Sequence, residues 1–218
     1  MSVLKNMAVC DLRGLSAEAA GKITEIINAA LVLLPKGASE ELLGALQAIK
    51  KTNVASVIMV DRDVEVKTRN GFCEITAADC SPGSESILLL NGLCVINAMP
   101  EDCGARLIVN GCAIEHDSLR GHGGIQFIAV NGLRTYADFD HVKKLHGKII
   151  IDAAYLQRLE PKTLLLDGTR LTFAKDVTPE LLDEKQLTIK SNKIYCPEAL
   201  LTSVAVRCID CAPKVKRR

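Results

Sequence analysis

The sequence contains no tryptophan and few other aromatic residues, which limits how its interior can be built. Aromatic residues make up 3% of the 218 residues, whereas hydrophobic residues make up 48%. The core must therefore come from Ile, Leu, Val, Ala and Cys, whose compact side chains suit a thin, regularly layered interior. The same shortage argues against sites for sugars or single-stranded nucleic acid, which rely on aromatic stacking.

Signals for secretion and for membrane insertion are also missing. The amino terminus lacks a basic region that leads into an apolar stretch, so we expect no secretion signal. The apolar runs at 29–34 and 87–90 are much shorter than the roughly 20 residues that cross a bilayer. Nine cysteines, an odd number in a chain long enough to fold without disulfides, favour a reducing compartment. We therefore predict a cytoplasmic protein without a membrane span.

Neither sign of charge is in excess. The chain has 27 basic and 26 acidic residues, a net charge of +1. No overall field attracts nucleic acid or an anionic membrane, and we predict no nucleic-acid partner. Basic residues do gather at 212–218, where Lys214, Lys216, Arg217 and Arg218 form a basic tail that we expect to be solvated.

An internal repeat is the strongest pattern in the sequence. The segments 88–96, 107–115 and 128–136 place Asn-Gly pairs at Asn91, Asn110 and Asn131, at spacings of 19 and 21 residues. Asn-Gly tolerates positive φ and can bend the chain, and the apolar residues alternate on both sides of the bend, which indicates strands. Looser matches extend the column to ten positions about 21 residues apart. These are Asn6, Asn28, Asn53, Asn70, Asn91, Asn110, Asn131, His146, Asp167 and Asn192.

Helix signals interrupt this pattern near both ends. The segment 38–51 has Ser39 as a candidate N-cap, followed by leucines at helical spacing. The segment 16–27 has the same features, and Thr178 is followed by proline at the expected first helical position. We expect the middle of the chain to be almost entirely β.

These observations predict a β-rich solenoid, similar to a β-helix, of about ten coils of about 21 residues, with short helices inserted near both ends. Residues 1–211 would form a single repeat domain, with helix-containing coils at 1–65, all-β coils at 66–136, and C-terminal coils and a cap at 137–211. The even spacing favours coils over a meander of hairpins. An α/β solenoid of the leucine-rich-repeat type is the alternative, although its leucine spacing before the asparagine is not met. In this register the side chains expected to point inward are Leu90, Leu93, Val109, Cys112, Ile114, Val130 and Leu133.

Histidines and carboxylates gather in one region. If neighbouring coils build a site there, its candidate residues are His116, Asp117, Asp138 and His141, as divalent-metal ligands or as a general acid/base pair. They do not fall at equal offsets from the column, so a solvated polar face is the simpler interpretation. The only C-x-x-C, Cys208 to Cys211, lacks the second ligand pair of a zinc site, and we assign the cysteines mainly to core packing.

No nucleotide, flavin or serine-hydrolase motif is present, so we predict no cofactor and identify no catalytic set. Two functions remain open. The first is a non-enzymatic structural or protein-interaction protein whose partner is another protein or a second copy. End caps would keep it discrete, and apolar cap residues would pair two copies: Leu42, Leu46, Leu200 and Leu201. The second is an enzyme or a ligand- or metal-binding protein with a polar site at 115–146.

Overall fold

The computed structural model describes residues 1–76, 79, 86–97, 105–121 and 125–215. Residues 216–218 of the basic tail and residues 122–124 of the predicted polar region at 115–146 lie outside these ranges. The chain forms two compact units. Whether residues 1–211 behave as one domain stays a prediction.

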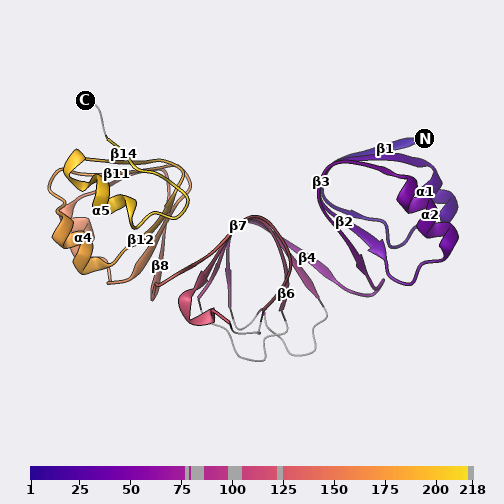
Figure 1. Ribbon diagram of the computed structural model, residues 1–218, viewed down its shortest axis with the longest axis horizontal. Coiled ribbons are helices and arrows are strands. Elements are labelled where there is room, and N and C mark those ends of the chain that lie inside the picture. Colours follow the sequence, from indigo (N-terminus) through magenta and orange to yellow (C-terminus); the bar gives the residue numbers. More distant parts are fainter. Residues whose placement is uncertain (77–78, 80–85, 98–104, 122–124, 216–218) are drawn as a thin grey trace. The chain divides into compact units, whose positions relative to one another are not determined.

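The N-terminal unit comprises Met1–Glu115 and Gly121–Thr135 and contains two parallel sheets (Figure 1). The first sheet has the order β1-β2-β3, from Ser2–Asp11, Ile23–Pro35 and Lys50–Val60, joined through α1 (Ala17–Gly21) and α2 (Glu40–Ala48). The second has the order β4-β5-β6-β7, from Val66–Ile75, Ile87–Ile96, Ala105–His116 and Ile125–Ala137. In both sheets, strands that are consecutive in the sequence are neighbours.

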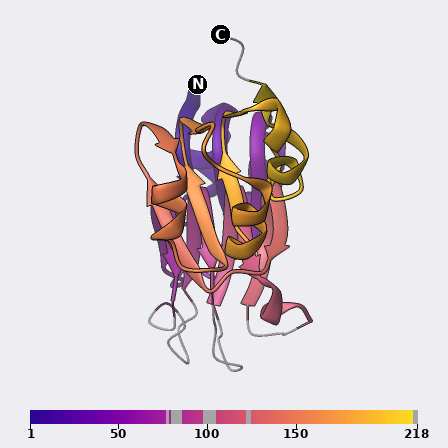
Figure 2. The same cartoon turned by 90° about the vertical axis from the view of Figure 1, so that its left-hand side faces the viewer.

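The C-terminal unit comprises His116–Arg120 and Tyr136–Arg218 (Figure 2). One sheet contains β8 (His141–Leu145), β10 (Thr163–Asp167) and β12 (Thr188–Ser191). The other contains β9 (Lys148–Ile151), β11 (Arg170–Phe173), β13 (Ile194–Cys196) and β14 (Lys214–Val215). The helices are α3 (Ala153–Gln157), α4 (Pro179–Lys185) and α5 (Leu201–Ala205), with short 3-10 turns at η2 (Asp117–Leu119) and η3 (Glu198–Leu200).

The predicted single solenoid of about ten coils is wrong. The strands form four separate parallel sheets of three or four strands, and in the described part of the chain β3 is not hydrogen-bonded to β4, nor β7 to β8. This separation also excludes the single α/β solenoid considered as an alternative. A physical reason lies in side-chain packing: Leu31 and Leu33 of β2 form one buried cluster with Leu89 and Ile108 of the second sheet. The two sheets thus bury apolar faces against each other.

This packing also corrects the expected core. Leu90, Val109 and Ile114 are buried as predicted, but Leu93, Val130 and Leu133 are only half-buried. The opposite face of the same strands is buried as well, because its side chains contact the first sheet. Parallel strands covered on both faces have near-continuous apolar sequences, as in the run at 87–90.

The expected helix starts are observed. The side chains of Ser16, Ser39 and Thr178 each accept a hydrogen bond from the backbone N–H three residues later, which satisfies one free donor of the first turn. Helix α1 is shorter than the predicted 16–27, because β2 already begins at Ile23. No helix in the described ranges combines the length and apolar character needed to cross a membrane.

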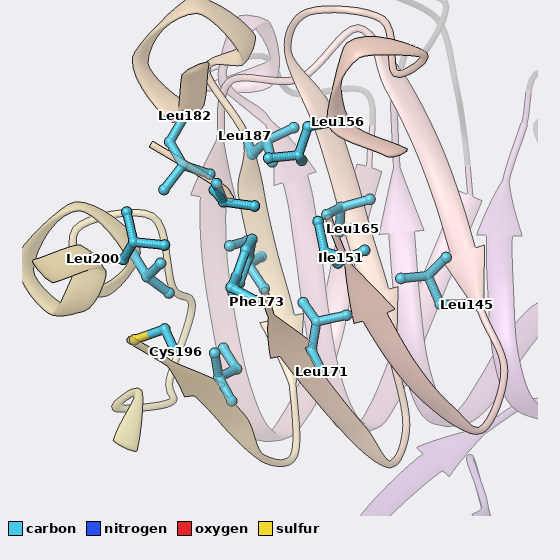
Figure 3. Packing of buried hydrophobic residues seen from close by; sticks show 14 residues of the cluster. Leu145, Ile151, Leu156, Leu165, Leu171, Phe173, Leu182, Leu187, Cys196 and Leu200 are labelled. Carbon is cyan, nitrogen blue, oxygen red and sulfur yellow. The ribbon is translucent and has the colours of Figure 1, made fainter. Parts of the chain in front are cut away.

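The C-terminal unit has a core of its own, built from sheet and helix residues together (Figure 3). Leu165, Leu171 and Phe173 come from the strands, and Leu156 and Leu182 come from α3 and α4. The helices thus cover the inner face of the sheets, which leaves alternate strand residues on the outer face.

Candidate functional site

The structure brings two of the four predicted site residues together. The Nε2 atom of His116 lies 3.9 Å from Oδ1 of Asp138. On the other side of the ring, Nδ1 accepts the backbone N–H of Ser118 at 3.1 Å and lies 2.6 Å from its hydroxyl oxygen. The ring also contacts Phe139 edge-on, at 5.4 Å between centroids.

These contacts fix the tautomer of His116. A backbone N–H can only donate, so Nδ1 must be the acceptor, and the neutral ring carries its hydrogen on Nε2, facing Asp138. Coordination of a metal through Nε2 would move that hydrogen to Nδ1, against the N–H of Ser118. Ser118 and Asp138 therefore position the His116 ring and do not leave Nε2 ready to bind a metal.

The remaining predicted residues have other partners. Asp117 accepts a hydrogen bond from Nε of Arg120 at 2.9 Å, and Asp138 pairs with Nζ of Lys162 at 2.8 Å. The hydrogen bond that Lys162 donates to the Asp138 carboxylate raises the pKa of Lys162. His141 is exposed at the start of β8. Within the described ranges no three His, Cys, Asp or Glu side chains lie close enough to hold a metal ion.

The asparagine column forms a hydrogen-bonded ladder in the first sheet. Nδ2 of Asn28 donates to Oδ1 of Asn6 at 3.0 Å, and Nδ2 of Asn53 donates to Oδ1 of Asn28 at 2.7 Å. All three residues have positive φ, between 51° and 59°, so the asparagines themselves make the bend. Asn28 and Asn53 therefore both bend their strands and tie them to the preceding strand.

A second ladder crosses β4, β5 and β6. Nδ2 of Asn91 donates to Oδ1 of Asn70 at 2.9 Å, and Nδ2 of Asn110 donates to Oδ1 of Asn91 at 3.4 Å. In β7 the amide of Asn131 has a different partner, because its Nδ2 donates to the hydroxyl of Ser56 in β3 at 3.0 Å. The expected continuous column is thus broken into two ladders.

In the second sheet the bend is made by glycine instead of asparagine. Gly92, Gly111 and Gly132 have φ of 133°, 144° and 139°, respectively, and they stack directly on one another. A Cβ atom on Gly111 would lie 2.1 Å from the carbonyl oxygen of Gly92. No side chain can occupy this inner column without moving a strand.

In the C-terminal unit the expected column is displaced. Strand pairing aligns Leu145, Asp167 and Ser191, so Asp167 belongs to the row, whereas His146 and Asn192 each fall one residue after it. Oδ2 of Asp167 accepts the hydroxyl of Ser191 at 3.1 Å. The row therefore continues with a carboxylate and a hydroxyl in place of amides.

The first ladder has a direction. Every Nδ2 donates toward the preceding strand, so Asn6 keeps its amide hydrogens at the edge of the sheet, and Asn53 keeps its carbonyl oxygen at the opposite edge. Neither group has a partner within the described residues, and both side chains are exposed. The two edges, β1 and β3, thus end in complementary hydrogen-bonding groups.

Burial keeps two of the thiols in their protonated form. The seven cysteines within the described ranges are not joined in disulfides. Burial raises the pKa of Cys94 to about 12 and that of Cys208, in the C-x-x-C, also to about 12. Because the thiolate is the nucleophile and the metal ligand, these two thiols are unreactive near neutral pH.

Comparison with known proteins offers no guide to function. No family model, no curated protein and no solved structure matches this chain.

Proposed function

We propose that this chain is a non-enzymatic structural protein that assembles with further copies of itself through the two edges of its N-terminal sheet. The observation that carries the proposal is the directed asparagine ladder, which ends in a donor at β1 and an acceptor at β3. A β3 edge placed beside the β1 edge of another copy would let Asn53 accept from Asn6, as each asparagine already does inside the sheet.

The side chains along the two edges match as well. Within one copy, Met7 and Val54 both pair with Ala29 of β2, and Cys10 and Val57 both pair with Val32. If this register is repeated between copies, Val54 would lie beside Met7 of the next copy, and Val57 would lie beside Cys10. Val57 is 43% exposed in a single copy and would become covered. The edges, of 10 and 11 residues, present unpaired backbone groups of the kind that recruit another strand.

The polarity of the ladder selects the mode of association. Two β1 edges would bring donors together, and two β3 edges would bring acceptors together, so only a head-to-tail contact is satisfied. Such a heterologous contact does not close on itself after two copies. Assemblies should therefore lengthen as the protein concentration rises.

The apolar cap residues do not support the closed dimer predicted from the sequence. Leu42, Leu46 and Leu200 are buried inside their own units, and Leu201 is half-buried. They stabilise single copies and leave little apolar surface for a contact between caps. A cytoplasmic location remains part of the proposal, supported by the lack of disulfides among the cysteines that the structure describes.

Analytical ultracentrifugation over a wide range of protein concentration tests the proposal. The key variant is Asn6→Asp, which keeps the oxygen that accepts from Asn28 within the copy but removes the donor offered to the next copy. A second variant, Val57→Lys, places a charge on the β3 edge. Its matched control is Val206→Lys, at a 74% exposed valine of the C-terminal unit.

The wild type and Val206→Lys should form species that grow with concentration, whereas Asn6→Asp and Val57→Lys should sediment as single copies. A wild type that stays a single copy at every concentration would overturn the proposal. Assembly that is equally strong in Asn6→Asp would show that the ladder does not carry the contact.

One observation favours the alternative, an enzyme or metal-binding protein at 115–146: the approach of His116 to Asp138. Metal analysis of protein purified without a histidine tag separates the two functions. Stoichiometric metal that is lost in His116→Ala would establish the alternative. The tautomer imposed by Ser118 leads us to expect none.

A further inference from the structure

Three cations lie in register on the outer face of the β9-β11-β13-β14 sheet. Lys148 is paired with Arg170 across β9 and β11, and Lys193 occupies the next place in this row, because Leu171 pairs with Ile194. Neighbouring strands in a sheet are about 4.8 Å apart, so these charges repel one another. All three are exposed, and none forms an ion pair with an acidic residue of the described ranges.

The next row on the same face places an isoleucine and a tyrosine beside a buried threonine and an exposed lysine. It contains Ile150, Thr172, Tyr195 and Lys214, which pair across the four strands. Ile150 is 65% exposed, an unusual position for a large aliphatic side chain. The guanidinium of Arg170 lies 5.9 Å from the ring centroid of Tyr195, so the aromatic ring is part of the basic face.

The inner face of this sheet is fully used by the core, so the outer residues are not needed to fold it. Leu171, Phe173, Ile194 and Cys196 alternate with the outer residues and belong to the buried cluster (Figure 3). The outer face thus keeps a repulsive row of charges beside an exposed apolar side chain, neither of which stabilises the unit.

Charge is also divided unevenly between the two units. The N-terminal unit has 11 of the 27 basic and 14 of the 26 acidic residues, which leaves 16 basic and 12 acidic residues in the C-terminal unit. The net charge of +1 therefore conceals a C-terminal unit with a positive charge. The alternating outer positions of its second sheet carry cations and no carboxylate.

We infer that this outer face binds the surface of an anionic lipid bilayer. A flat sheet face with a basic row can contact several lipid headgroups at once, while Ile150 and Tyr195 reach the boundary between headgroups and acyl chains. A nucleic acid would be held by the cations alone and would not require an exposed isoleucine. The binding is peripheral, and it does not depend on the proposed self-assembly.

Sedimentation with sucrose-loaded vesicles tests this inference. Vesicles of phosphatidylcholine alone are compared with vesicles of equal parts phosphatidylcholine and phosphatidylglycerol, with the protein kept dilute enough to remain single copies. The face variant is Lys148→Gln, Arg170→Gln, Lys193→Gln. Its control removes the same charge from exposed sites outside the two outer rows: Lys143→Gln, Arg158→Gln, Lys175→Gln.

The wild type should bind the phosphatidylglycerol vesicles, and added salt should weaken the binding. Each basic residue near an anionic surface contributes about a fivefold factor in partitioning, so the face variant should bind about a hundredfold more weakly. The control variant should lose far less. Ile150→Ser should weaken binding at every salt concentration, because it removes an apolar contact that salt does not screen.

Two results would overturn the inference. An equal loss in the face and control variants would show that net charge alone drives binding. Duplex DNA that binds as tightly as the vesicles, with both affinities unchanged in Ile150→Ser, would show that the face recognises nucleic acid instead. The thermal unfolding of the face variant checks its fold, and its melting temperature should rise because the repulsive row is gone.

Discussion

Replacement of Gly111 by alanine tests the stacked glycines of the second sheet. The new Cβ would lie 2.1 Å from the carbonyl oxygen of Gly92, a distance at which one strand must move. The matched control is Gly71→Ala, in the edge strand of the same column, where no atom lies within 4 Å of the added Cβ. Both glycines have positive φ, 144° and 84°, so both variants also strain the backbone.

The difference between the two variants can be estimated from the structure. Positive φ at a residue with a side chain costs roughly 1–2 kcal/mol, and this should be the whole effect in Gly71→Ala. In Gly111→Ala, separating β5 from β6 also weakens hydrogen bonds worth about 1 kcal/mol each and opens space around buried Leu90 and Val109. We expect Gly111→Ala to be destabilised by at least about 2 kcal/mol more than its control.

Urea unfolding followed by circular dichroism measures both free energies, and native-state hydrogen exchange of the strand amides reports where protection is lost. Protection should fall in β5 and β6 of Gly111→Ala and only near the edge in Gly71→Ala. Equal stabilities for the two variants would refute the close stacking of the glycine column.

Three further predictions follow from burial and capping. Val109→Asp places an unpaired charge at a fully buried site and should abolish cooperative folding, as judged by the loss of a sharp thermal transition. Ser39→Ala removes the N-cap of α2 and should lower the free energy of unfolding by about 1 kcal/mol in urea titrations. Cys94 should resist iodoacetamide at pH 8 in the folded protein and react once the protein is unfolded. Burial raises the pKa of Cys94 from its ordinary value of 9.0 to about 12, so the stability that its protonated thiol contributes is present at neutral pH and is lost as the pH rises from 9.0 toward 12.

The local features of the fold could be predicted from the sequence because single residues determine them. An asparagine before glycine marks a bend, and a Ser or Thr before a helical run marks an N-cap, wherever the segment is placed in space. These signals predict the bends at Asn91 and Asn110 and the caps at Ser39 and Thr178, which the structure confirms. The displaced row in the C-terminal unit could not be predicted because Ser191 is not an asparagine and precedes no glycine. It nevertheless pairs with Asp167, in the place that the sequence pattern assigns to Asn192.

The division into sheets could not be predicted because spacing along the chain does not say which strands form hydrogen bonds. Asn53 and Asn70 are 17 residues apart, close enough to the repeat length to suggest one column. Instead, the first sheet turns an apolar face toward the second, so Leu31 and Leu89 belong to one buried cluster. The candidate site failed to gather for a similar reason: Arg120 and Lys162, which pair with Asp117 and Asp138, carry no signal in the sequence.

Paired asparagines are separated by similar lengths of chain, which affects where folding can begin. Paired asparagines are 22, 25, 21 and 19 residues apart, so each new strand must close a loop of nearly the same length. Loop-closure entropy changes by only about 0.6 kcal/mol for a doubling of loop length, so these steps differ by much less. No strand pair has a large entropic advantage as a nucleus, and folding within each sheet should begin wherever side-chain burial is greatest. In the second sheet that place is the β5–β6 pair, which contains the fully buried Leu89 and Ile108.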